Sequence, residues 1–194
     1  MRRGAGNSSH MKIAILDIQG SVVEHLRALE ACGVDVVRVK KPADLEGCAG
    51  LVIPGGESTT LSKLLSRFGL RDAILAHKDL GIWGTCAGAI LLAKEIEDGE
   101  GVESLGLMDI KVKRNAYGRQ LDSFEAEVVF AGKKVPAVFI RAPKISEVKR
   151  SCDILASSGD EVVAVREGKY LATTFHPEMT NDLTVVQYFI SMCA

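Results

Sequence analysis

From Met11 onward, short apolar runs alternate with segments of helical periodicity, and this alternation constrains the fold more than any other feature of the chain. Apolar runs at 12–18, 34–39, 50–54 and 80–85 predict buried strands, and the amphipathic segments between them predict helices. Strands that alternate with helices usually pair in parallel through right-handed crossovers. We therefore expect an α/β domain of three layers, with an open, mostly parallel sheet and helices on both of its faces.

The first helical segment, "SVVEHLRALEACG" (21–33), illustrates the pattern. Its apolar positions recur at helical spacing, and Gly33 ends it. We expect the buried face to comprise Val22, Leu26, Ala28 and Leu29. His25 is assigned to the charged face, as a solvated side chain.

The later segments have a different hydrophobic pattern. Between Leu107 and Phe175 the runs are shorter and more typical of strands, which predicts an antiparallel extension of the same sheet. These runs are "LMDIKVKR", "FEAEVVF", "VPAVFIRAP", "EVVAVREG" and "YLATTF". The final segment predicts a helix capped by Thr180 or Asn181, and the run from Ser58 to Thr60 is interpreted as the cap of the helix at 58–69.

Composition limits the functional classes. The chain has 194 residues, 47% of them hydrophobic, which suits one domain over 11–194. Residues 1–10 are polar and aperiodic, and we interpret them as a cloning scar or disordered lead. A net charge of −1 with mixed signs argues against nucleic-acid or membrane partners, and no apolar run is long enough for a membrane span.

The five cysteines are odd in number, widely spaced and without a CxxC pair. A disulfide framework or zinc site is therefore not expected, and a reducing cytoplasm fits the composition. We expect neither a metal nor a cofactor.

One cysteine stands in a distinctive context, "GTCAG" (84–88). The sequence has the G-x-C-x-G form of a strand-turn-helix elbow, which presents a nucleophile at the carboxyl end of a strand. Cys86 would lie at a helix N-terminus, where exposed amides stabilise a thiolate. A buried, unreactive cysteine in an apolar turn is the alternative, because free cysteine is among the most buried residue types.

A cysteine nucleophile requires a base and a group that orients the base. His176 ends a strand-like run, and Pro177 favours an extended conformation there. In an extended segment, residues i and i+2 point the same way, so we expect Glu178 to hold the His176 imidazole. The alternative is a strand-end histidine followed by a helix-capping glutamate.

The loop "PGGESTT" (54–60) leaves another predicted strand. Gly56 would turn its amide toward a ligand, and the Ala87 amide is the natural second donor for an oxyanion. A phosphate-binding loop is the competing interpretation, but the spacing does not match and Glu57 would repel a phosphate.

Together, "GTCAG", "FHPE" (175–178) and "PGG" resemble the class I, or triad, glutamine amidotransferases. Further stretches resemble, within that class, the glutaminase subunits of pyridoxal 5′-phosphate synthases. These stretches are "DIQGSVVEH", "PGGEST", "GTCAGAILLAKEI", "RNAYGRQLDSFE" (114–125) and "FIRAP" (139–143). The resemblance runs from Met11 to the C-terminal helix and implies a flavodoxin-like α/β fold.

The resemblance implies a role for each matching residue. Cys86 would be the nucleophile, with His176 and Glu178 completing the triad. Glutamine would be bound by Gly56, Glu57, Ser58, Arg114, Ile140 and Arg141. Arg114 has a second interpretation, as a solvated side chain at a strand edge, since it follows Lys111 and Lys113. Met179 stands where the family more often has leucine.

The resemblance also implies an activity and a partner: hydrolysis of glutamine through a cysteinyl thioester, with the ammonia passed to a separate (β/α)₈-barrel synthase that makes pyridoxal 5′-phosphate. "DIQGSVVEH" would contribute to docking or to an oxyanion switch, and Gln19-Gly20 would otherwise be an ordinary turn. Three alternatives remain: the glutaminase of another amidotransferase such as imidazole glycerol phosphate synthase, a cysteine hydrolase or protease, and a non-enzymatic domain with a reactive thiol.

Overall fold

The computed structural model describes residues 11–116 and 123–194; the proposed lead at 1–10 and part of "RNAYGRQLDSFE" lie outside these ranges. The first strands are β1 (Lys12–Leu16), β2 (Asp35–Val39), β3 (Gly50–Ile53), β4 (Gly81–Thr85), β5 (Ala93–Glu97) and β6 (Met108–Lys113). The later strands are β7 (Ser123–Phe130), β8 (Lys133–Ile140), β9 (Lys144–Val148), β10 (Asp153–Ser158), β11 (Glu161–Glu167) and β12 (Tyr170–Thr173).

The helices are α1 (Val22–Ala31), α2 (Ser58–Arg67), α3 (Leu70–Ala76), α4 (Ala87–Leu92) and α5 (Thr184–Met192), with short 3-10 turns η1 (Pro42–Leu45) and η2 (Pro177–Met179). The main sheet has ten strands in the order β2-β1-β3-β4-β12-β11-β9-β6-β5, and β10 pairs with β11 outside this path. From β2 to β12 all neighbours are parallel, as the alternating sequence pattern predicts.

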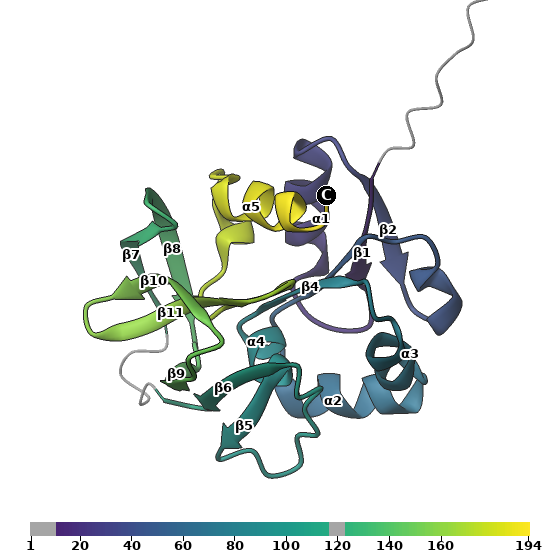
Figure 1. The fold of residues 1–194 in the computed structure, drawn as a ribbon, viewed down its shortest axis with the longest axis horizontal. Helices are drawn as coiled ribbons and strands as arrows, with labels where there is room; N and C mark the ends of the chain where they lie inside the picture. The colour runs from purple at the N-terminus through teal and green to yellow at the C-terminus, as the bar shows by residue number, and fades with distance from the viewer. Residues whose placement is uncertain (1–10, 117–122) are drawn as a thin grey trace, which may run out of the picture.

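Two apolar cores lie on opposite faces of the sheet, because successive side chains of a strand point to opposite sides. Ile13 and Ile15 of β1 face the core that includes α1 and α5, whereas Ala14 and Leu16 face the core that includes α2 and α3. Figure 1 shows α1 and α5 on one side of the sheet and α2 and α3 on the other. The predicted three-layer arrangement is confirmed.

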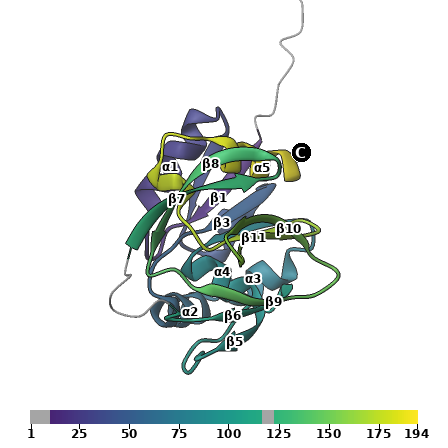
Figure 2. The ribbon, with the colours of Figure 1, turned by 90° about the vertical axis from the view of Figure 1, so that its left-hand side faces the viewer.

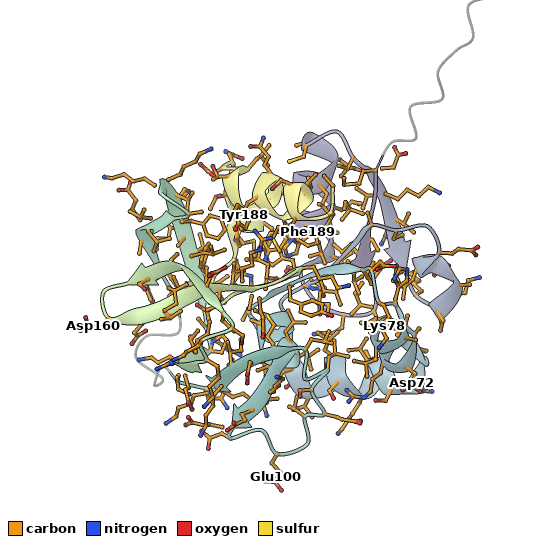
Figure 3. The ribbon with its side chains drawn as sticks, in the orientation of Figure 1. Asp72, Lys78, Glu100, Asp160, Tyr188 and Phe189 are labelled. Carbon is orange, nitrogen blue, oxygen red and sulfur yellow. The ribbon has the colours of Figure 1, made fainter. Side chains whose placement is uncertain are left out.

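Aromatic side chains fill the core beneath α5. Trp83 of β4 is fully buried and lies 5.6 Å, centroid to centroid, from the Phe189 ring. Tyr188 precedes Phe189 on α5, and both are labelled in Figure 3. The Tyr188 ring meets the Phe130 ring of β7 edge-on, with 5.1 Å between the centroids. These contacts fix α5 against both the sheet and the β7–β8 hairpin.

The antiparallel extension is confirmed in part. β11 pairs antiparallel with β12 and β9, and β9 with β6. However, β7 and β8 form a separate two-stranded sheet, which stands beside the main one in Figure 2. The runs "FEAEVVF" and "VPAVFI" therefore do not extend the main sheet as expected, since their apolar faces instead close over the core on the α5 side.

Two helix caps differ from expectation. Glu57, rather than a hydroxyl of residues 58–60, is the N-cap of α2, and its carboxylate accepts hydrogen bonds from the amides of Thr59 and Thr60 at 3.0 and 2.6 Å. At α5 the N-cap is Leu183, rather than the expected Thr180 or Asn181, and Asp182 just before it accepts a hydrogen bond from the Thr184 amide at 2.8 Å. Each of these two helices thus begins beside a carboxylate, which the positive end of a helix dipole favours.

Candidate active site

Cys86 lies between a buried strand and a short helix. β4 ends at Thr85, α4 begins at Ala87, and Cys86 between them has a φ of 50°, a conformation that non-glycine residues rarely adopt. The Cys86 amide donates to Thr173 O at 2.8 Å, which ties the turn to β12. Cys86 is buried, with 7% of the residue exposed. This is the strained elbow that the G-x-C-x-G sequence predicts.

Small residues allow the close contacts of this elbow. A Cβ on Gly84 would lie 2.4 Å from the backbone of Gly88, and a Cβ on Gly88 would lie 2.1 Å from Ile53 O. Both distances are far below van der Waals contact, so only glycine lets α4 approach β3 and β4 this closely. The expected tight packing of helix against strand is present.

His176 and Glu178 are in contact, as predicted, although the backbone reason was wrong. His176 Nδ1 lies 2.7 Å from Glu178 Oε1. The chain after His176 is not extended: Pro177–Met179 form the 3-10 turn η2, which folds the carboxylate back under the imidazole. Both residues are buried, at 5% and 6% exposure.

Sheet topology brings this pair to the cysteine. β4 and β12 are parallel neighbours with Thr85 opposite Thr173, so Cys86 and His176 follow adjacent strand ends. Gly55 lies between them, because a Cβ there would be 2.5 Å from His176 Cε1 and 3.3 Å from Cys86 Cβ. The three predicted triad residues therefore meet at the carboxyl edge of the sheet, where open α/β sheets bind ligands.

Electrostatics favour a charged imidazole. Burial acts to lower the pKa of His176, but hydrogen bonding and charge interactions with Cys86 and Glu178 raise it to about 10. Burial likewise acts to raise the pKa of Glu178, but the nearby His25 and His176 lower it overall. An ionised carboxylate therefore supports a protonated base beside the thiol.

The loop after β3 is held by the segment after β1. The side-chain oxygen of Gln19 accepts from the Glu57 amide at 3.2 Å, and the Ser21 amide donates to Gly55 O at 2.9 Å. A Cβ on Gly56 would lie 2.2 Å from that Gln19 oxygen. The loop that carries the proposed Gly56 oxyanion donor is thus packed directly against Gln19 and its neighbours.

A cavity of about 270 Å³ opens beside the thiol, near the lower end of the roughly 300–1,000 Å³ of typical ligand pockets. Its lining comprises Gly56, Glu57, Ser58, Cys86, Ala87, Ile90, Arg114, Asn115, Arg141 and Pro143. The sequence-predicted residues in this set are therefore brought together around one space. Ile90, Asn115 and Pro143 were not singled out by sequence.

Ile140 approaches the cysteine through its backbone, with its carbonyl oxygen 3.8 Å from Cys86 Sγ. Arg141 follows at a φ of 44° and lines the cavity. Arg114 is fixed rather than solvated: its guanidinium donates to Asp98 O at 3.2 Å and Thr59 Oγ1 at 3.3 Å, and lies 3.5 Å from Glu57. The cavity thus has guanidinium groups for a carboxylate and one carboxylate for an ammonium.

Hydrogen bonding also fixes the charge of Glu57. Burial acts to raise the pKa of its carboxyl, but hydrogen bonds from Thr59 and Thr60 lower it to about 2. Glu57 therefore remains an anion at the cavity wall at any physiological pH.

Sequence reasoning misplaced His25. Its side chain is fully buried, 2.9 Å from Thr85 Oγ1 and 3.4 Å from Glu178 Oε1, rather than on a solvated face. Leu26, expected in the buried face, is only half-buried. The signal was present, because His25 lies three residues after Val22 and four before Leu29, on the buried stripe of α1.

Comparison with known proteins identifies the family. The sequence pattern of the SNO glutamine amidotransferase family matches residues 15–194. The chain belongs to this family. Among its relatives within this amidotransferase family is the "Pyridoxal 5′-phosphate synthase subunit PdxT" of Geobacillus kaustophilus, 51% identical over 186 residues and covering 94% of each chain. The protein of the same name from Brevibacillus brevis is 52% identical, covering 94% of this chain and 97% of that one.

Solved structures agree with this assignment to the glutamine amidotransferases. A crystal structure described as a glutamine amidotransferase superimposes with a TM-score of 0.89 at 41% identity, covering 93% of this chain and 98% of that one. A Thermoplasma acidophilum protein described as a putative GMP synthase subunit shares the fold, with a TM-score of 0.72 at 21% identity and coverage of 95% and 94%. Over the described ranges, none of the helices combines the length and apolar character needed to cross a membrane.

Proposed function

We propose that this chain is the glutaminase subunit of a pyridoxal 5′-phosphate synthase, and that Cys86, His176 and Glu178 are its catalytic triad. The observation that carries the proposal is the placement of a strained cysteine elbow and a buried His–Glu pair, joined at 2.7 Å, beside one amino-acid-sized cavity. Relatives that share about half of this sequence over nearly its full length bear that name.

The residues divide the reaction between them. The Cys86 thiolate attacks the side-chain carbonyl carbon of glutamine, and the amides of Gly56 and Ala87 hold the resulting oxyanion. His176 then gives its proton to the departing nitrogen, which leaves as ammonia, and Glu178 keeps the imidazole oriented. His176 next takes a proton from water, which attacks the thioester carbonyl and releases glutamate.

The cavity residues would hold the rest of the substrate. Arg114 and Arg141 provide guanidinium groups that pair with a carboxylate, and the anionic Glu57 suits the substrate ammonium. Ser58 lines the same cavity, and the Ile140 carbonyl oxygen lies beside the thiol. Both charged ends of free glutamine thus find a partner.

A partner subunit is required by the chemistry of the product. Ammonia released into water at neutral pH is protonated and loses its nucleophilicity, so the partner must cover the site and receive it. The proposed partner is a (β/α)₈-barrel synthase subunit, which forms a hetero-oligomer with this chain. We place the complex in the cytoplasm, in keeping with five cysteines that form no disulfide among the described residues.

Glutamate release from glutamine, measured with and without the barrel synthase, tests the proposal. We expect activity that rises when the synthase is added, that is abolished by Cys86→Ala, and that survives Cys48→Ala, a change at another buried cysteine. Absence of glutamate release under both conditions, or activity that persists in Cys86→Ala, would refute it. Selective capture of a different synthase in a pull-down would refute the pyridoxal phosphate assignment alone.

A further inference from the structure

His25 connects the triad carboxylate to the strand that presents the nucleophile. From its buried position on α1, its Nε2 atom lies 2.9 Å from Thr85 Oγ1 and 3.4 Å from Glu178 Oε1. Thr85 immediately precedes Cys86 in the chain. The ring meets Trp83 edge-on at 5.1 Å between centroids, which fixes its plane. One imidazole therefore spans α1, β4 and η2 at the site.

The contacts define the tautomer of His25. A carboxylate oxygen can only accept a hydrogen bond, so the approach to Glu178 Oε1 is favourable only when Nε2 carries the hydrogen. Nδ1 has no hydrogen-bond partner among the residues that the structure describes. A proton there would be a buried donor without an acceptor, and burial lowers the pKa of His25 despite the nearby Glu178. In its neutral form, His25 therefore carries its hydrogen on Nε2.

Glu178 Oε1 is approached from three sides. His176 Nδ1 lies at 2.7 Å, the Ser21 hydroxyl donates at 2.9 Å, and His25 Nε2 lies at 3.4 Å. We propose that His25 is a positioning residue for the triad. It orients the Glu178 carboxylate toward His176, and its contact with Thr85 fixes the position of that carboxylate relative to the Cys86 turn. The inference rests on the proposed glutaminase function and adds to it a residue outside the triad.

A packing role alone does not account for this side chain. An apolar residue would fill the same space without desolvating two ring nitrogens, one of which stays unpaired among the described residues. The polar contacts to Thr85 and Glu178 are what the imidazole supplies and an aliphatic side chain cannot. Without the His25 contacts, the Ser21 hydroxyl would be the remaining group beside His176 that holds Glu178 Oε1. The carboxylate would then shift, and the His176 ring that it orients would shift with it.

The matching experiment compares two replacements of His25. Since small misplacements of catalytic groups cost about 100-fold in rate, we expect His25→Leu to lower kcat by about 10- to 100-fold with little change in KM. The side-chain amide nitrogen of the glutamine in His25→Gln can reach the position of Nε2. The kcat of this variant should therefore stay within about 3-fold of the wild type, a much smaller loss than that of His25→Leu. Equal losses in both variants, or no loss in either, would overturn the inference.

Two controls separate positioning from damage to the fold. Leu29→Ala, on the same buried face of α1, should lower the melting temperature without lowering kcat at a temperature where it is folded. In a Glu178→Gln background, His25→Leu should have no further effect on kcat, because the carboxylate it orients is gone. If His25→Leu lowers kcat by the same factor in the wild type and in the Glu178→Gln background, His25 does not act through Glu178.

Alkylation of Cys86 by iodoacetamide gives a readout that does not need glutamine. We expect His25→Leu to slow alkylation at neutral pH and His25→Gln to restore it, because the thiolate depends on a correctly oriented His176. If the wild-type protein releases no glutamate but shows this pattern, the proposed function fails and the positioning role stands. If alkylation is the same in all three proteins, the positioning role fails.

Discussion

His176 Nδ1 and Glu178 Oε1 are 2.7 Å apart in a site where both side chains are almost wholly buried. The hydrogen bond and charge of the carboxylate, together with Cys86, overcome the effect of burial and raise the pKa of His176 from 6.5 to about 10. We expect side-chain NMR to show His176 still protonated at about pH 8, below that raised value, and to show a lower pKa in Glu178→Gln. Titration of His176 near 6.5 in the folded wild type would contradict this.

The sign of the accompanying stability effect follows from the direction of the shift. Because the folded pKa of His176 lies above its unfolded value of 6.5, its protonation stabilises the fold fully below about pH 6.5. This contribution is lost as the pH rises toward about 10. Glu178, whose pKa is lowered, contributes in the opposite direction, above its unfolded pKa of 4.5.

Gly55→Ala should inactivate the enzyme while leaving it folded. The added Cβ would lie 2.5 Å from His176 Cε1 and 3.3 Å from Cys86 Cβ, so the His176 ring must move away from Cys86. A displacement of about 1 Å is enough for a loss of about 100-fold in kcat. Steady-state kinetics with the partner present would measure it.

The matched control for this change is Gly132→Ala in the β7–β8 turn. Gly132 has a φ of +85°, which side-chain-bearing residues rarely adopt, but no atom lies within 4 Å of the position that an added Cβ would take. We expect a small loss of stability and unchanged kcat. A Gly55→Ala protein as active as this control would show that the glycine is not needed between Cys86 and His176.

Glu57→Gln should make the free energy of unfolding fall less steeply as the pH is lowered. The pKa of Glu57 is lowered from 4.5 to about 2, so its stabilising effect is complete above about pH 4.5 and is lost as the pH falls toward about 2. The side chain is half exposed, which makes the effect modest. Urea unfolding between about pH 5 and about pH 2.5, referenced to wild type, should show the smaller slope in the variant; identical slopes would contradict the cap as its cause.

Arg114→Lys tests substrate recognition. The guanidinium contacts Asp98 O, Thr59 Oγ1 and Glu57 at once, a geometry that the point charge of lysine cannot reproduce. We expect KM for glutamine to rise about 10-fold with kcat nearly unchanged, as for loss of uniform binding. Lys113→Arg, at the exposed preceding position, should leave both constants unchanged; a fall in kcat alone would assign Arg114 to catalysis instead.

The local hydrophobic pattern predicted the parallel half of the fold because most elements there have a recognisable pattern of apolar residues. β1, β3 and β4 are continuous apolar runs, and α1 and α2 have helical stripes. β5 was missed because two of its first three residues, Lys94 and Glu95, are exposed and charged. The separate β7–β8 sheet could not be foreseen, since an alternating pattern identifies a strand and its buried face but not its partner.

The Cys86 elbow and the glycine loop at 54–60 could be predicted from the residues themselves, because such turns have compact signatures, and the substrate-binding residues followed from the family resemblance. Contacts across the fold could not be predicted. The link from His25 to Glu178 depends on how α1 rests on β4 and η2, and the turn at Pro177 replaces the extended backbone that sequence favoured. Such contacts are set by tertiary packing, which no single segment encodes.

The adjacency of β4 and β12 has a consequence for the growing chain. The proposed nucleophile, Cys86, and its proposed base, His176, follow the ends of neighbouring strands but are separated by roughly 90 residues of sequence. During synthesis at about 5–20 residues per second, Cys86 is made several seconds before His176 exists. Nascent and C-terminally truncated chains therefore carry a thiol without a base, and glutamine hydrolysis begins only when nearly the whole chain has been translated.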